Sequence, residues 1–122
     1  MQTELVHDET QRDGTSLVVD RVQLRPAPVL AQGHGPGAEA WAGDSEDGEV
    51  RYVVLRRPAA ASMGIEWTVR LYVAGERDLA FGIHWTAVES GAGRDLVSAV
   101  GVMCERIRAR MDILRQAARS AA

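Results

Sequence analysis

The chain has 122 residues, of which 46% are hydrophobic and 25% are charged, and its formal net charge is −3. This length allows one domain with one modest core, and the composition is ordinary for a globular protein. The net acidic charge argues against generic nucleic-acid binding. The absence of lysine excludes a Schiff-base lysine and a phosphate-loop lysine.

The charge is distributed unevenly along the chain. Residues 1–50 carry three arginines against ten acidic residues, which gives −7, whereas residues 51–122 carry eleven arginines against seven acids, which gives +4. This asymmetry suggests a polar partner or self-association between unlike surfaces, although acids in solvated loops are the simpler alternative. The absence of lysine and asparagine, whose codons are AT-rich, suggests a GC-rich genome, such as that of an actinobacterium or its phage.

The chain shows no sign of export or membrane insertion. It begins with Met-Gln-Thr-Glu, which has neither the basic start nor the apolar run of a secretory signal. No apolar run approaches the roughly 20 residues that span a bilayer. Cys104 is the single cysteine, so no internal disulfide can form. We therefore expect a cytoplasmic protein.

The first part of the chain predicts little regular structure. Residues 1–14 are polar and charged and predict a flexible N-terminal arm, followed by a single domain over residues 15–122. β-Branched residues in 16–24 predict a first strand, which Pro26 and Pro28 end. Residues 29–49 predict a long Gly-rich and acidic loop, with short extended pieces at 29–31 and 39–42.

The middle of the chain predicts antiparallel strands. Residues 50–57 predict a strand that Pro58 ends, and residues 65–74 and 79–89 predict a hairpin whose turn is 75–78. Within the hairpin, apolar and polar residues alternate, which predicts one buried face. We expect that face to carry Ile65, Trp67, Val69, Leu71, Val73, Leu79, Phe81, Ile83, Trp85 and Ala87.

The last part predicts one long helix over residues 94–120. Its main apolar stripe consists of Leu96, Val100, Met103, Ile107, Met111, Leu114 and Ala118, with Cys104 on its border. A sheet with one apolar face and a helix with one apolar stripe bury each other. The sequence therefore predicts an α+β fold, an antiparallel β-meander of four to five strands with one long C-terminal helix packed across one face.

Two surfaces are candidates for binding. The first is a second group on the helix, away from the main stripe, which suggests a homodimer interface: Val102, Arg106, Ala109, Arg110 and Ile113. The second is a polar cluster on the sheet face opposite the core, which suits single-stranded nucleic acid: Thr68, Arg70, Tyr72, His84 and Thr86. Scattered exposed apolar residues and a solvated sheet face are the alternative interpretations.

We expect no catalytic site, metal site or cofactor. Gly33–Ala38 formally matches the dinucleotide pattern, but Pro36 and the acidic loop after it favour a simple glycine-rich loop. His7, His34, His84 and Cys104 do not have zinc-ligand spacing. The sequence also lacks the common hydrolase and metalloprotease motifs, so we expect a protein that is not an enzyme.

Several strands followed by one long helix, over roughly residues 16–120, resemble the architecture of the PC4-like transcriptional coactivators. That resemblance implies a small dimeric protein that binds single-stranded DNA, and it is one of topology alone. The first expectation is a non-enzymatic protein-interaction module, a homodimer with a further protein partner, of the accessory, inhibitor or assembly type. The alternatives are a single-stranded nucleic-acid-binding protein and a small-molecule-binding domain whose cavity lies between sheet and helix.

Overall fold

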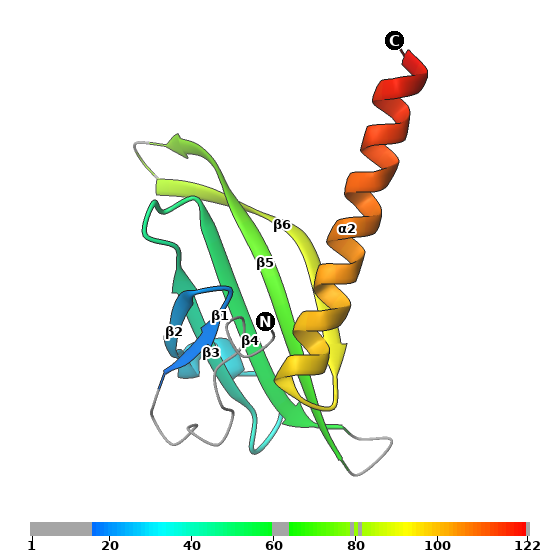
Figure 1. The fold of residues 1–122 in the computed structure, drawn as a ribbon. Helices are drawn as coiled ribbons and strands as arrows, with labels where there is room; N and C mark the ends of the chain where they lie inside the picture. Colours follow the sequence, from blue (N-terminus) through cyan, green and yellow to red (C-terminus); the bar gives the residue numbers. More distant parts are fainter. Residues whose placement is uncertain (1–15, 60–63, 79, 81, 122) are drawn as a thin grey trace.

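The computed structural model describes residues 16–59, 64–78, 80 and 82–121, and its strands form one curled antiparallel sheet with a long helix after them (Figure 1). Each strand pairs with the next along the chain, so the sheet is a meander. The elements are β1 (Leu17–Val19), β2 (Val22–Pro26), the 3-10 helix η1 (Pro28–Ala31), β3 (Glu39–Asp44), β4 (Val50–Pro58), β5 (Ile65–Asp78), β6 (Gly82–Gly93) and α2 (Leu96–Ala121). The predicted α+β meander is confirmed, with six strands rather than four to five.

Two features account for the additional strands. The segment predicted as one strand is a hairpin, in which Val19 pairs with Val22 across a two-residue turn of Asp20 and Arg21. Both turn residues have positive φ, 48° and 66°, which is the backbone of a type I′ turn. Glycine or asparagine usually marks such turns. This turn has neither, so the sequence did not indicate it. The other strand, β3, contains the short extended piece predicted at 39–42 inside the loop and continues to Asp44.

Two boundary predictions were wrong, and others lie outside the described residues. Residues 29–31 belong to the helical turn η1 rather than to an extended piece. The predicted 75–78 turn continues as strand, because Arg77 pairs with Ile83 and Asp78 with Gly82, which moves the hairpin connection to 79–81. The predicted N-terminal arm and most of the connector after β4 lie outside the described residues.

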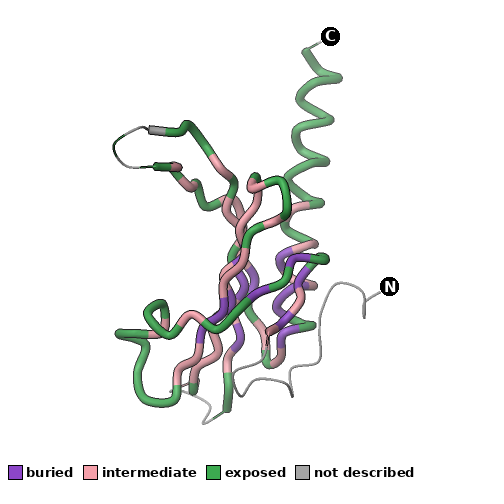
Figure 2. Tube along the Cα trace, turned by 90° about the vertical axis from the view of Figure 1, so that its left-hand side faces the viewer, coloured by how far each residue is buried: buried purple, intermediate pink, exposed green. Residues whose placement is uncertain are grey.

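The core lies on the face of the sheet that α2 and the β1–β2 hairpin cover, which we call the inner face (Figures 1 and 2). Trp41 and Trp67 stack there with ring centroids 5.7 Å apart. The buried side chains come from β1 to β5 and from the first half of α2: Leu17, Val19, Val22, Leu24, Trp41, Tyr52, Val54, Trp67, Val69, Leu96, Ala99, Val100 and Met103.

The first half of α2 is tightly seated on the sheet. Asp95 caps the helix, because its Oδ1 accepts a hydrogen bond of 2.7 Å from the Ser98 backbone N–H. Gly91 on β6 lies directly under the helix, and a Cβ there would lie 2.6 Å from the Met103 nitrogen. Glycine at this position therefore lets the helix backbone approach the strand closely.

The second half of α2 leaves the sheet and extends beyond it (Figure 1). Every residue from 108 to 121 is exposed, and Figure 2 shows this half as a continuous exposed stretch. The prediction that the sheet covers the whole apolar stripe was therefore wrong for Met111, Leu114 and Ala118. A 26-residue helix is about 39 Å long, and only its first half meets the sheet.

Among the described residues, α2 is too polar to cross a bilayer, and no other helix has the necessary length.

Candidate functional site

The face of the sheet opposite the core, which we call the outer face, presents side chains in rows across the strands. Paired residues on neighbouring strands share a face, so the register places Arg25, Ala42, Val53 and Arg70 in one row. The next row contains Asp44, Arg51, Tyr72 and Ala87. These rows bring together residues that lie far apart in the sequence.

A β-bulge on β6 changes which side chains reach the outer face. Leu71 pairs with Glu89 but Tyr72 pairs with Ala87, so Val88 has no opposite residue and the alternation of β6 is reversed beyond it. Trp85 therefore lies on the outer face, where Arg51 covers its ring. The prediction that Trp85 and Ala87 belong to the core was wrong for this reason.

The other residues predicted for the core face differ in how far they are buried, according to their position along the strands. Trp67 and Val69 are buried and Leu71 packs against the core, as predicted. Ile65, the first residue of β5, is 42% exposed, and Val73, in the second half of the strand, is 36% exposed. Ile83 is half-buried beyond the second register shift of the hairpin, and Leu79 and Phe81 lie outside the described residues.

The bulge also divides the predicted polar cluster. Thr68, Arg70 and Tyr72 are every second residue of this part of β5, and their side chains lie on the outer face. Thr86 pairs with Val73, whose side chain lies on the inner side, and His84 lies two residues away on the same side of β6. The structure therefore brings Arg70 and Tyr72 together with Trp85 and Arg51 instead of with His84 and Thr86.

A groove of about 670 Å³ crosses the outer face from β2 to β6. Its floor includes Ala42 and Val53, and Leu30 of η1 contributes to one wall. Its charged and aromatic lining comes from five strands: Arg25, Asp44, Arg51, Tyr72 and Trp85. This groove lies on the opposite face of the sheet from the cavity that the small-molecule alternative placed between sheet and helix.

Arg51 is the most firmly held cation of the groove. Its Nε and Nη2 donate hydrogen bonds of 2.7 and 3.0 Å to the two carboxylate oxygens of Asp44. Its Cζ lies 4.2 Å from the centroid of the Trp85 ring, which is a cation–π contact. The hydrogen bond to Asp44 raises the pKa of the Arg51 guanidinium, so the group is charged at every physiological pH.

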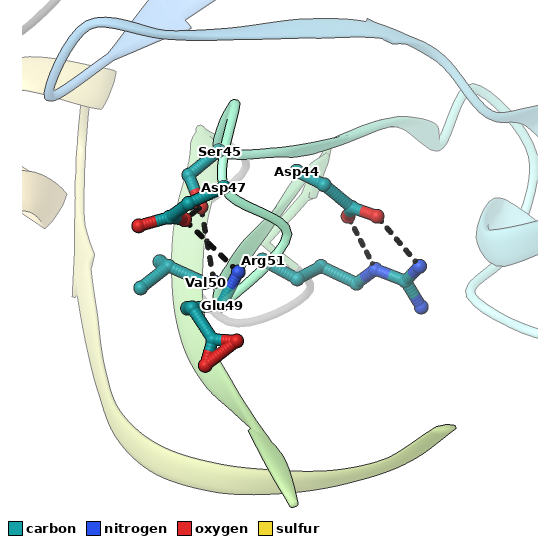
Figure 3. Close-up of polar contacts among 6 residues, drawn as sticks. All are labelled: Asp44, Ser45, Asp47, Glu49, Val50 and Arg51. Carbon is teal, nitrogen blue, oxygen red and sulfur yellow. Dashed lines mark hydrogen bonds and ion pairs between the residues drawn. The ribbon is translucent and has the colours of Figure 1, made fainter. Parts of the chain in front are cut away.

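The turn between β3 and β4 forms the acidic edge of this face (Figure 3). Asp47 Oδ1 accepts hydrogen bonds from Ser45 Oγ at 2.6 Å and from the Glu49 backbone N–H at 3.0 Å. These bonds, the Ser45 bond first, lower the pKa of Asp47. Gly48 has a φ of 74°, which completes the turn. Glu46, Asp47 and Glu49 are exposed on this ordered turn.

The predicted helix interface is only partly free. Arg106 Nη1 donates to the Ser90 carbonyl at 3.0 Å, and Arg110 Nη2 donates to Glu89 at 3.0 Å, so both arginines fasten α2 to β6. Val102 is half-buried, whereas Ala109 and Ile113 are exposed. The sequence did not indicate the larger exposed surface, which the main stripe forms at Met111 and Leu114.

Two polar groups lie at the core. The Tyr52 hydroxyl donates a 3.1 Å hydrogen bond to Asp20 Oδ2. Burial, helped by the charge of Asp20, raises the pKa of Tyr52 well above its ordinary value. Burial also raises the pKa of the half-buried Cys104 thiol, which keeps it protonated and poorly nucleophilic at neutral pH.

Within the part of the chain that the structure describes, no three His, Cys, Asp or Glu side chains gather closely enough to hold a metal ion. His34 and His84 are exposed, and His7 lies outside the described residues. No known protein family, curated protein or solved structure matches the chain.

Proposed function

We propose that the protein is a non-enzymatic interaction module that forms a homodimer through the second half of α2. The observation that carries this proposal is the uncovered part of the helical stripe. Met111 and Leu114 of this stripe are 45% and 57% exposed, and Ile113 of the second group is 67% exposed, on a helix that has left its own sheet. Burial of one such aliphatic side chain contributes roughly 1.5–3 kcal/mol, so this segment gains stability when a partner covers it.

The charges around the stripe favour a particular arrangement of the two copies. Arg108, Arg115 and Arg119 lie along one side of the stripe, because they are seven and four residues apart on the helix. Direct pairing of two such helices would place arginines next to arginines, which is destabilising. An acidic surface is therefore the better match for the segment.

This chain offers such a surface at the same end of the fold. The ordered turn between β3 and β4 carries Glu46, Asp47 and Glu49, which are all exposed. Figure 3 shows Asp47 and Glu49 on this turn. The adjacent inner face of the sheet has an apolar patch, since Val50 is half-buried and Val73 is 36% exposed. We propose that the helix of each copy lies against this patch and turn of the other copy, which gives a reciprocal two-fold interface.

The first test measures the molar mass of the protein by light scattering over a range of concentrations. Leu114→Glu places a charge in the proposed interface and should make the protein monomeric without unfolding it, because Leu114 is exposed in the single chain. Val29→Glu is the matched control, since Val29 is 71% exposed on η1, outside the proposed interface. A wild-type protein that stays monomeric at high concentration contradicts the proposal.

A charge exchange tests the arrangement itself. Arg115→Glu and the double change Glu46→Arg with Glu49→Arg should each weaken the dimer by about tenfold or more, because each places like charges together. Arg115 forms an ion pair with the exposed Asp112, which contributes little stability. The combined variant should regain most of the wild-type affinity. Loss of dimer without recovery in the combination would contradict contact between the helix and this turn.

A further inference from the structure

We propose that the groove on the outer face binds a compact ligand that combines a planar aromatic ring with one anionic group. The groove has a volume of about 670 Å³, within the roughly 300–1,000 Å³ typical of small-molecule sites. It lies on the opposite face of the sheet from the core, and Arg25, which lines it, stands on the outer face of β2. This site goes beyond the proposed dimer and does not depend on it.

We infer an aromatic ring in the ligand from one wall of the groove, which Tyr72, Arg51 and Trp85 form. Arg51 stacks on Trp85, and its Nε–Nη2 edge is fixed by the two oxygens of Asp44. A guanidinium held in this way is a rigid, flat surface, and such surfaces stack on aromatic rings. Tyr72 stands directly opposite Arg51 on the neighbouring strand and adds a second ring.

The floor of the groove suits the same ligand. Ala42 and Val53 pair with each other between Arg25 on one side and Arg70 on the other. Small apolar side chains at this place leave depth for a ring and provide an apolar surface for it. Burial of the ring against this floor gives the hydrophobic part of the binding energy.

We infer an anionic group in the ligand from Arg25. The charge of Arg51 is already balanced by Asp44, whereas Arg25 is exposed and forms no ion pair with any residue that the structure describes. Arg25 and Val53 are two strand spacings apart, about 10 Å. A ring over Val53 therefore places a carboxylate or phosphate substituent within reach of Arg25.

The acidic edge of the face favours a compact ligand over a nucleic-acid strand. Asp44 lines the groove, and Glu46, Asp47 and Glu49 follow on the adjoining turn. A strand that continued past the groove in that direction would bring its phosphates next to these carboxylates, and like charges repel.

Calorimetric titration of the full-length protein tests the ligand class. The probes are 2-naphthoate and adenosine monophosphate, which place a carboxylate and a phosphate on an aromatic ring system. The comparison compounds are 2-naphthalenemethanol, which lacks the charge, and cyclohexanecarboxylate, which lacks the ring. At least one probe should bind about tenfold more tightly than both comparison compounds, because each comparison compound loses either the charge-assisted hydrogen bond or the ring stacking. Equal or absent binding overturns the proposal.

Variants locate the site. Arg25→Gln and Trp85→Leu should each weaken binding of the better probe by about tenfold, while Arg94→Gln, a matched change at an exposed arginine just before α2, should not change it. Circular dichroism checks that each variant is folded. Equal affinity of Arg25→Gln and Arg94→Gln overturns the site. Tighter binding of an oligothymidylate than of thymidine monophosphate overturns the assignment to a compact ligand.

Discussion

The hydroxyl of Tyr52 donates a 3.1 Å hydrogen bond to Asp20 Oδ2, although the two residues are 32 positions apart in the sequence. Tyr52 is the third residue of β4 and is buried, whereas Asp20 is the first residue of the β1–β2 turn. The bond therefore fastens a short, two-stranded hairpin to the rest of the sheet. Such a hairpin is only marginally stable without packing of this kind.

Removal of this hydroxyl should destabilise the fold modestly. We expect Tyr52→Phe to lower the free energy of unfolding by about 1 kcal/mol, the usual contribution of one hydrogen bond. Urea unfolding followed by circular dichroism measures the change. Tyr72→Phe is the control, because the Tyr72 hydroxyl has no hydrogen-bond partner among the described residues, and its effect should stay within about 0.5 kcal/mol. Equal effects of the two changes would contradict a structural role for the Asp20 contact.

The same contact predicts a pH dependence. Burial raises the pKa of Tyr52, and the unfolded chain returns it to an ordinary value of about 10. Below pH 10 the hydroxyl is protonated in both states and its contribution is complete. Above pH 10 the unfolded state loses the proton first, so stability should fall with rising pH by up to about 1.4 kcal/mol per pH unit.

Urea unfolding of wild type and Tyr52→Phe, at a series of pH values from about 8 to about 11, measures this fall. The fall above pH 10 should be shallower in the variant. Burial also raises the pKa of Cys104, so a separate decrease that begins at a lower pH should persist in both proteins. Identical slopes above pH 10 would show that Tyr52 is not the group responsible.

A substitution in the turn of the first hairpin should make the protein more stable. Arg21 has a φ of 66°, and a non-glycine residue in this left-handed region costs roughly 1–2 kcal/mol. We expect Arg21→Gly to raise the melting temperature through a gain of about 0.5–1 kcal/mol. Asp20→Gly relieves similar strain but removes the acceptor of Tyr52, so it should gain less. A larger gain for Asp20→Gly than for Arg21→Gly would contradict this account.

Two glycines near α2 should respond in opposite directions to the same substitution. Gly91→Ala places a methyl group 2.6 Å from the Met103 nitrogen, so the helix must shift, at a cost of about 1–3 kcal/mol. Gly101 lies within α2 and has open space around its Cα, so Gly101→Ala should stabilise the helix by about 1 kcal/mol. Thermal unfolding of both variants measures the difference. Destabilisation by Gly101→Ala would contradict the conclusion that a Cβ at this position meets open space.

The sequence alone determined the elements whose patterns are local. The alternation in the first part of β5 placed Trp67 and Val69 correctly in the core. The spacing of apolar residues after Gly93 gave the helix, which the structure starts at Leu96 and ends at Ala121. Such periods depend only on backbone geometry, and for that reason a single sequence reveals them.

Only the tertiary structure decided which of these surfaces are covered. One unpaired residue, Val88, reverses the alternation of β6 and moves Trp85 from the predicted core to the groove. The helical stripe is continuous in sequence, yet Leu96 is fully buried and Leu114 is 57% exposed. A periodic pattern indicates which side chains lie on the same face of a strand or helix. Whether anything lies opposite them depends on bulges and on the lengths of packed elements, which are relations between distant parts of the chain.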